Sequence, residues 1–263
     1  MADSTHAETM CGTIFRACDD AVRQGVLIRR ASQQDKEFHF QDWFTGRLED
    51  SGISFDPPRR NTYPDFRLVH AAESYEVKGL AWPGRSANFD ANSQYPSGFH
   101  NGRVIFYVFG RYPAQVTEDE FPLVDLVICH GDFLNAHHEY AHENTSFRGF
   151  GSYGDLQIRD RKMYISPTPF ALTQGTTGQR TLIIPEGYPL SEQFVQVGRL
   201  VRVETDRLIT GYSFDMGTNV LTPRFVTNPA AGKLHTFVAY RLSDDGPEVT
   251  LTTTPPQAQL GSS

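Results

Sequence analysis

The clearest helical pattern along the chain lies in residues 32–48. Phe40, Trp43, Phe44 and Leu48 recur at intervals of three and four residues, which places them along one stripe of a helix. Acidic residues near the start of the segment suit the positive end of a helix dipole. The segment is therefore predicted to be a helix that buries an aromatic face.

Short apolar runs separated by turn residues predict strands in most of the remaining chain. Residues 104–109 and 123–129 are continuous apolar runs, as in strands that are covered on both faces. The carboxyl half repeats shorter segments between Gly, Pro, Asn and Asp. The predicted strands there are residues 182–185, 194–203, 218–226 and 234–242. A helix that begins near Ser191 is an alternative for the second of these.

Residues 63–79 read as two short strands joined by a turn, and they carry candidate chemistry. Glu76 and Lys78 are two positions apart on a strand, so they share one face, and Val77 points to the other. The turn brings Asp65 toward this pair. Two carboxylates can hold a hard divalent cation, and an ammonium group can orient a water nucleophile and neutralise phosphate charge. The alternative is an exposed hairpin with a solvated Glu-Lys pair.

The Pro-Asp step, the gap and the Glu-x-Lys sequence resemble the motif of the PD-(D/E)XK nuclease superfamily, to which many restriction endonucleases belong. The order helix, strand pair with motif, intervening segment, strand, strand is also similar to the core of that superfamily. The resemblance covers residues 32–129. It implies an α/β fold with a restriction-endonuclease-like core, in which a mixed central sheet is flanked by helices, followed here by a strand-rich C-terminal elaboration.

The resemblance also implies a mechanism and a set of site residues. Asp65, Glu76 and the carbonyl group of Val77 would hold Mg²⁺, and Lys78 would position the attacking water. In the family the preceding helix often adds an acidic residue to the metal site. The chain has Gln41 and Asp42 at that place. The expected activity is that of a type II restriction-like endonuclease, a Mg²⁺-dependent hydrolase of phosphodiester bonds in double-stranded DNA at a specific, palindromic sequence, working as a homodimer.

Length and composition are those of a globular protein with many turns. The chain has 263 residues, of which 39% are hydrophobic, 22 are glycine and 16 are proline. We expect an N-terminal helical segment (1–31), the catalytic core (32–129) and a strand-rich recognition and dimerisation region (130–263), packed as one compact unit. Three cysteines and no apolar targeting run favour the cytoplasm, without a membrane partner.

Because the net charge is −7, any positive potential that attracts DNA must be confined to one part of the protein surface. The resemblance places recognition in the added C-terminal region, which contains side chains suited to base edges and phosphates. The candidate DNA contacts are Asn135, Arg148, Arg159, Arg161 and Lys162.

A histidine-rich patch from His130 to His142 supports a competing hypothesis. Imidazoles and carboxylates lie close together in this stretch and could bind a transition metal, as in a cupin-like enzyme. They belong to His130, Asp132, His137, His138, Glu139 and His142. Their spacing matches no established metal motif, and a polar loop after the last core strand would explain the same residues. A DNA-binding module without catalysis is the other alternative, in which Glu76 and Lys78 form a surface ion pair.

Overall fold

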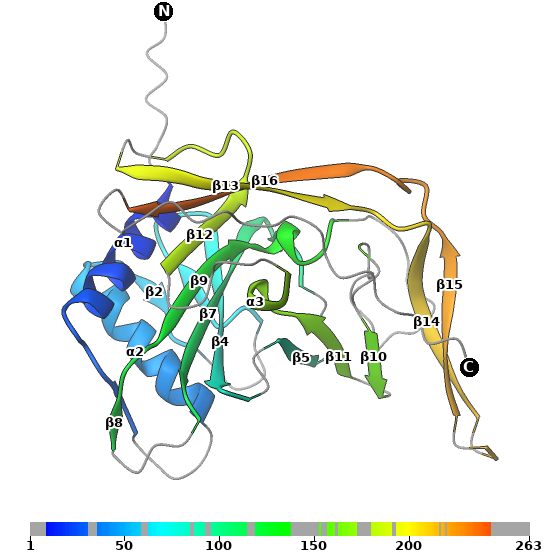
Figure 1. Ribbon diagram of the computed structural model, residues 1–263, viewed down its shortest axis with the longest axis horizontal. Coiled ribbons are helices and arrows are strands. Elements are labelled where there is room, and N and C mark those ends of the chain that lie inside the picture. Colours follow the sequence, from blue (N-terminus) through cyan, green and yellow to red (C-terminus); the bar gives the residue numbers. More distant parts are fainter. Residues whose placement is uncertain are drawn as a thin grey trace, which may run out of the picture.

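The computed structural model describes most of the chain and contains a large mixed β-sheet (Figure 1). The described residues are 9–30, 36–58, 63–84, 87–92, 96–114, 119–137, 153, 157–160, 163–172, 180–190, 193–215, 217–218 and 220–242. Within them, the largest sheet has nine strands, with the order β13-β16-β12-β9-β7-β4-β3-β2 and β6 paired to β7. The expected mixed α/β class with a mixed central sheet is therefore confirmed.

The strands nearest the motif form an antiparallel meander followed by a parallel neighbour. β2 (Phe55–Asp56), β3 (Phe66–Leu68) and β4 (Glu73–Trp82) pair antiparallel in sequence order. β7 (Arg103–Pro113) then lies parallel to β4 along its whole length. The predicted hairpin is confirmed, and β2 is at the edge of the sheet, where the two following prolines cost no ladder hydrogen bond.

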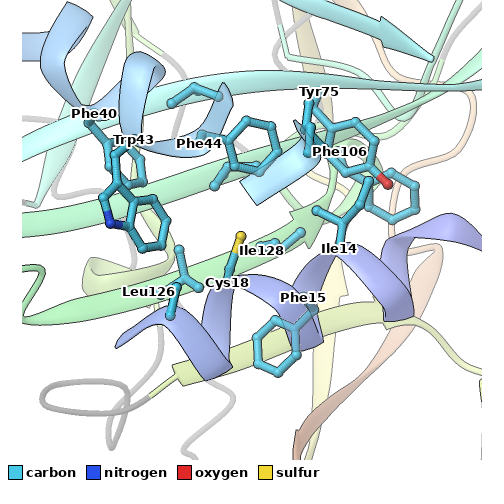
Figure 2. Packing of buried hydrophobic residues seen from close by; sticks show 14 of the residues in the cluster. Ile14, Phe15, Cys18, Phe40, Trp43, Phe44, Tyr75, Phe106, Leu126 and Ile128 are labelled. Atoms are coloured by element: carbon cyan, nitrogen blue, oxygen red, sulfur yellow. The ribbon is translucent and has the colours of Figure 1, made fainter. Parts of the chain in front are cut away.

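Two helices cover one face of this sheet. α1 (Met10–Arg23) and α2 (Lys36–Asp50) pack against strands β4, β7 and β9 (Figure 2). The predicted helix is confirmed as α2, because its aromatic stripe is buried: Phe44 contacts the rings of Phe66 and Tyr75. α1 contributes Ile14, Phe15 and Cys18 to the same core.

The second face of the sheet carries smaller elements. β5 (Asn88–Asn92), β11 (Met163–Pro167) and β10 (Gln157–Asp160) form a three-stranded sheet, and α3 (Pro169–Leu172) and the 3-10 turn η1 (Gly131–Phe133) lie beside it. Phe89 of β5 contacts the rings of Tyr107 and Phe109 of β7. The short strands β1 (Ile28–Arg29) and β8 (Glu120–Phe121) pair separately, and β6 spans Phe99–His100.

The C-terminal strands extend the central sheet. β9 (Asp125–His130), β12 (Arg180–Pro185), β16 (Leu234–Leu242) and β13 (Phe194–Val203) continue it beyond β7. The predicted strands in these regions are confirmed, and the helix near Ser191 is replaced by β13. β14 (Arg207–Asp215), which the sequence pattern did not predict, pairs with β15 (Val220–Thr227) in a separate ribbon.

Two findings bear on the environment of the protein. Cys11, Cys18 and Cys129 are buried and carry free thiols. Among the residues that the structure describes, the helices are too short or too polar to cross a membrane.

Candidate functional site

The motif hairpin brings Asp65 and Glu76 directly opposite each other. Phe66 pairs with Tyr75 and Arg67 with Ser74, so Asp65, just before β3, faces Glu76 on β4. The backbone N–H of Asp65 donates to Oε2 of Glu76 at 3.2 Å, and the N–H of Val77 donates to Oδ2 of Asp65 at 2.9 Å. Each carboxylate thus reaches across to the other strand, which keeps both acidic groups at one place on the hairpin.

The main chain of Val77 adds an oxygen to the same place. In an extended strand the N–H and C=O groups of one residue point to the same side, as the paired hydrogen bonds of antiparallel ladders show. Because the N–H of Val77 points to Asp65, its carbonyl group also points toward that side of β4. Two carboxylates and one carbonyl oxygen form a set of hard oxygen ligands, which is the chemistry that Mg²⁺ and Ca²⁺ prefer.

Lys78 joins the site through Glu76. Its Nζ atom is 2.9 Å from Oε1 of Glu76. The side chains of Lys78 and Glu76 are 18% and 12% exposed. A solvated pair on an open sheet face would be largely exposed, so this arrangement disagrees with the surface-pair alternative.

Two tyrosines that the sequence analysis did not single out border the carboxylates. Tyr107 of β7 pairs with Glu76, and its hydroxyl lies 2.9 Å from the hydroxyl of Tyr63. Burial, and after it the negative charge of Glu76, raises the pKa of Tyr63, so the phenol stays protonated. Tyr63 also contacts the ring of His100 edge to face, at 5.1 Å between centroids. The contribution of Tyr107 depends on the parallel pairing of β4 with β7, which the local pattern does not reveal.

The expected contribution from the preceding helix is not formed. α2 contacts β4 through Phe44 and Tyr75. Side chains alternate between the two faces of a strand, so Glu76 points to the face opposite α2. Asp42 is exposed and lines a separate hollow of about 570 Å³, whose lining includes Trp43 and Glu120 but not Asp65, Glu76 or Lys78. The placement of Gln41 and Asp42 at the metal site is therefore corrected.

The histidine patch is only partly within the described chain, and that part serves the fold. His130 is buried, and its Nδ1 accepts from the N–H of Asp132 at 3.2 Å. Asp132 in turn accepts from the N–H of Gly98 at 3.1 Å. Burial lowers the pKa of His130, with partial opposition from Asp132. The described residues contain no group of three or more potential metal ligands of the His, Cys, Asp or Glu type. His138 and His142 lie outside them.

Of the candidate DNA contacts, only Asn135 and Arg159 lie within the described residues. Asn135 is 3% exposed and donates to the carbonyl group of Pro96 at 2.9 Å, so its side chain is buried in the fold and does not face a base; its expected role as a DNA contact is wrong. Arg159 is in β10. Arg148, Arg161 and Lys162 lie outside the described residues.

Comparisons of the chain with protein-family models, with curated proteins and with solved structures found no match in any of the three. The geometry of the hairpin is thus the main basis for any functional assignment.

Proposed function

We propose that the protein is a Mg²⁺-dependent endonuclease of the PD-(D/E)XK type that cleaves double-stranded DNA at a specific sequence. The observation that carries the proposal is the shielded cluster of Asp65, Glu76 and Lys78. Their spacing in sequence suggested a metal-dependent phosphodiesterase, and the hairpin holds the two carboxylates and the ammonium group together.

The order of elements around the cluster supports the proposal. α2 is followed by the antiparallel meander β2-β3-β4, then by an intervening segment and by β7, which is parallel to β4. This is the order helix, motif strand pair, intervening segment, strand that the resemblance implies. Parallel pairing requires the chain to cross over between β4 and β7. In the described part of that crossover the chain forms β5 and β6.

The residues of the cluster suit distinct steps of phosphodiester hydrolysis. Asp65, Glu76 and the carbonyl group of Val77 would hold the magnesium ion, which supplies Lewis-acid stabilisation of the charge that develops on the phosphate. Lys78, which forms an ion pair with Glu76, would orient the attacking water and offset the negative charge of the phosphate. Tyr63 and Tyr107 fix the packing beside Glu76.

The competing functions have less support. A non-catalytic module would leave Glu76 and Lys78 solvated, whereas both are largely shielded. A histidine-based metal enzyme would need accessible imidazoles, whereas His130 is buried and its Nδ1 is occupied as an acceptor. A double-stranded, palindromic DNA substrate and a homodimer with one active site per strand complete the proposal on the strength of the resemblance.

Separating DNA binding from cleavage tests this proposal. Lys78→Ala should abolish cleavage of plasmid DNA in Mg²⁺ but retain sequence-specific binding in Ca²⁺, because the ammonium group acts on the water and the scissile phosphate. Lys233→Ala is the matched control, since Lys233 is exposed in the turn before β16. Cleavage by the Lys78→Ala variant at the wild-type rate would reject the proposed role.

A further inference from the structure

The face of β4 that carries Glu76 and Lys78 continues past the candidate site to an exposed tryptophan. Glu76, Lys78, Leu80 and Trp82 alternate along β4, whose register with β7 has no irregularity, so these side chains share one face. Leu80 is buried, whereas Trp82, at the end of the strand, is 39% exposed. At about 3.3 Å per residue, Trp82 lies roughly 13 Å from Lys78 along the strand.

Arg111 of β7 supports the Trp82 ring from one side. Its guanidinium group lies 5.6 Å from the centre of the Trp82 ring and 4.0 Å from the centre of the Phe170 ring. Arg111 also forms an ion pair with Asp125, and the two side chains are 5% and 0% exposed. The exposed part of the indole is therefore the part that Arg111 does not cover. Because Asp125 balances the charge of Arg111, this position offers an aromatic surface without a net charge.

The edge of β4 between the candidate site and Trp82 has no strand beside it in the described chain. β3 pairs with β4 only at Ser74 and Tyr75, and β7 pairs with the other edge. From Glu76 to Trp82, the edge on the β3 side is therefore open within the described residues. A DNA strand with a phosphate at Glu76 and Lys78 can follow this edge, and the distance to Trp82 is that of a few nucleotides.

The chemistry at Trp82 suits a nucleobase better than a phosphate. Every base has a π-face that can stack on an aromatic side chain, whereas a phosphate requires positive charge. Single exposed aromatic residues are common on protein surfaces. Phe225, for example, is also 39% exposed and has the guanidinium group of Arg207 4.8 Å from its ring centre, but it lies on the separate β14–β15 ribbon. Trp82 differs because it shares a strand face with the candidate site.

We propose that Trp82 is a stacking platform for a base of the cleaved DNA strand that has left the duplex, a few nucleotides from the scissile phosphate. The inference rests on the proposed nuclease function, which puts the scissile phosphate at Glu76 and Lys78. A base inside a duplex has no free face for the ring, so the substrate must be opened locally beside the cut. The face of β4 thus combines phosphate chemistry at one end with base stacking at the other.

Binding of two short single strands to the full chain tests the platform. The probes are a labelled oligothymidylate and an abasic strand of the same length, measured by fluorescence anisotropy in Ca²⁺ at one salt concentration. Trp82→Ala should weaken binding of the oligothymidylate roughly 5- to 150-fold, the range that stacking of one base supplies, and leave binding of the abasic strand unchanged. Trp82→Phe keeps a π-face and should retain part of the affinity. Phe225→Ala, the matched control, should bind both strands like the wild type.

Intrinsic fluorescence gives a second readout, because the chain has two tryptophans and the other, Trp43, is 5% exposed. The oligothymidylate should quench the wild type, and Trp82→Phe should remove the quenching.

Three results would overturn the proposal. They are a wild type that binds the oligothymidylate no more tightly than the abasic strand, a Trp82→Ala variant that loses affinity equally for both strands, and a Phe225→Ala variant with the same loss as Trp82→Ala. Thermal melting checks that each variant folds. The comparison of the two strands needs no cleavage, so cleavage of plasmid DNA in Mg²⁺ decides the nuclease proposal separately.

Discussion

Removing the charge of Lys78 should destabilise the protein, and a divalent cation should reverse part of the loss. Lys78→Ala leaves the carboxylate of Glu76, whose side chain is 12% exposed, without the ammonium group that lies 2.9 Å away in the wild type. Losing one partner costs 3–5 kcal/mol in fully buried pairs, and exposed pairs contribute about 0–1 kcal/mol. For this mostly shielded pair we expect a loss of about 1–3 kcal/mol, and so a decrease in Tm of roughly 2–10 °C.

Thermal melting in EDTA and then in Mg²⁺ or Ca²⁺ measures both effects. A cation held by Asp65 and Glu76 would replace the lost positive charge, and at about 100 times its Kd it would add about 2.7 kcal/mol of stability. The double substitution Asp65→Asn with Glu76→Gln should show no response to the cation. Arg199→Ala, which removes an exposed pair with Glu186, controls for surface charge. A wild-type Tm that is unchanged by either cation would refute the metal site.

Three further predictions concern the framework of the site. Gly110→Ala should cost about 1–3 kcal/mol in chemical denaturation, since the added Cβ would lie 2.3 Å from Cζ of the buried Phe40 ring; an unchanged midpoint would contradict the packing. Arg103→Ala should cost about 1.5–3 kcal/mol, because its Nη1 donates to three main-chain carbonyl groups around the motif turn, those of Leu68, Ala71 and Glu73. Burial lowers the pKa of His130 below its usual 6.5, so the unfolded chain takes up the proton first and stability should fall as pH drops from 6.5 through the folded-state pKa. His130→Asn keeps an acceptor for the N–H of Asp132 and should flatten this pH dependence of stability, measured by urea titration between about pH 8 and pH 5. An equally steep pH dependence in this variant would show that another group causes it.

Local periodicity predicted the elements that have a strong apolar pattern of their own. The stripe of Phe40, Phe44 and Leu48 predicted α2, because a helix that covers a sheet must bury one face. The continuous apolar runs that predicted β7 and β9 were equally clear signals, since both strands are covered on both faces. β14 was not predicted, because Gly211 and the irregularity at Thr210 interrupt its alternation.

The candidate site was predictable as far as it depends on one hairpin. A two-residue period and one turn suffice to bring Asp65 to Glu76 and Lys78. The rest depends on which strands become neighbours and on which face a helix covers. Tyr107 reaches Glu76 only because β7 lies parallel to β4. Asp42 points elsewhere because α2 covers the opposite face of β4, and nothing within the helix sequence specifies that side.

Metal-dependent DNA cleavage by a matched pair of carboxylate variants tests the central claim most directly. Glu76→Gln removes a proposed ligand, and Glu73→Gln changes the same functional group three residues away on β4, where Glu73 accepts hydrogen bonds from Tyr75 and from the N–H of Met10 on the other face of the strand. The wild type and Glu73→Gln should cut plasmid DNA in Mg²⁺ and yield fragment ends that map to one sequence, and Glu76→Gln should not cut. Cleavage by Glu76→Gln at the wild-type rate, or no cleavage of any plasmid by the folded wild type, would contradict the account.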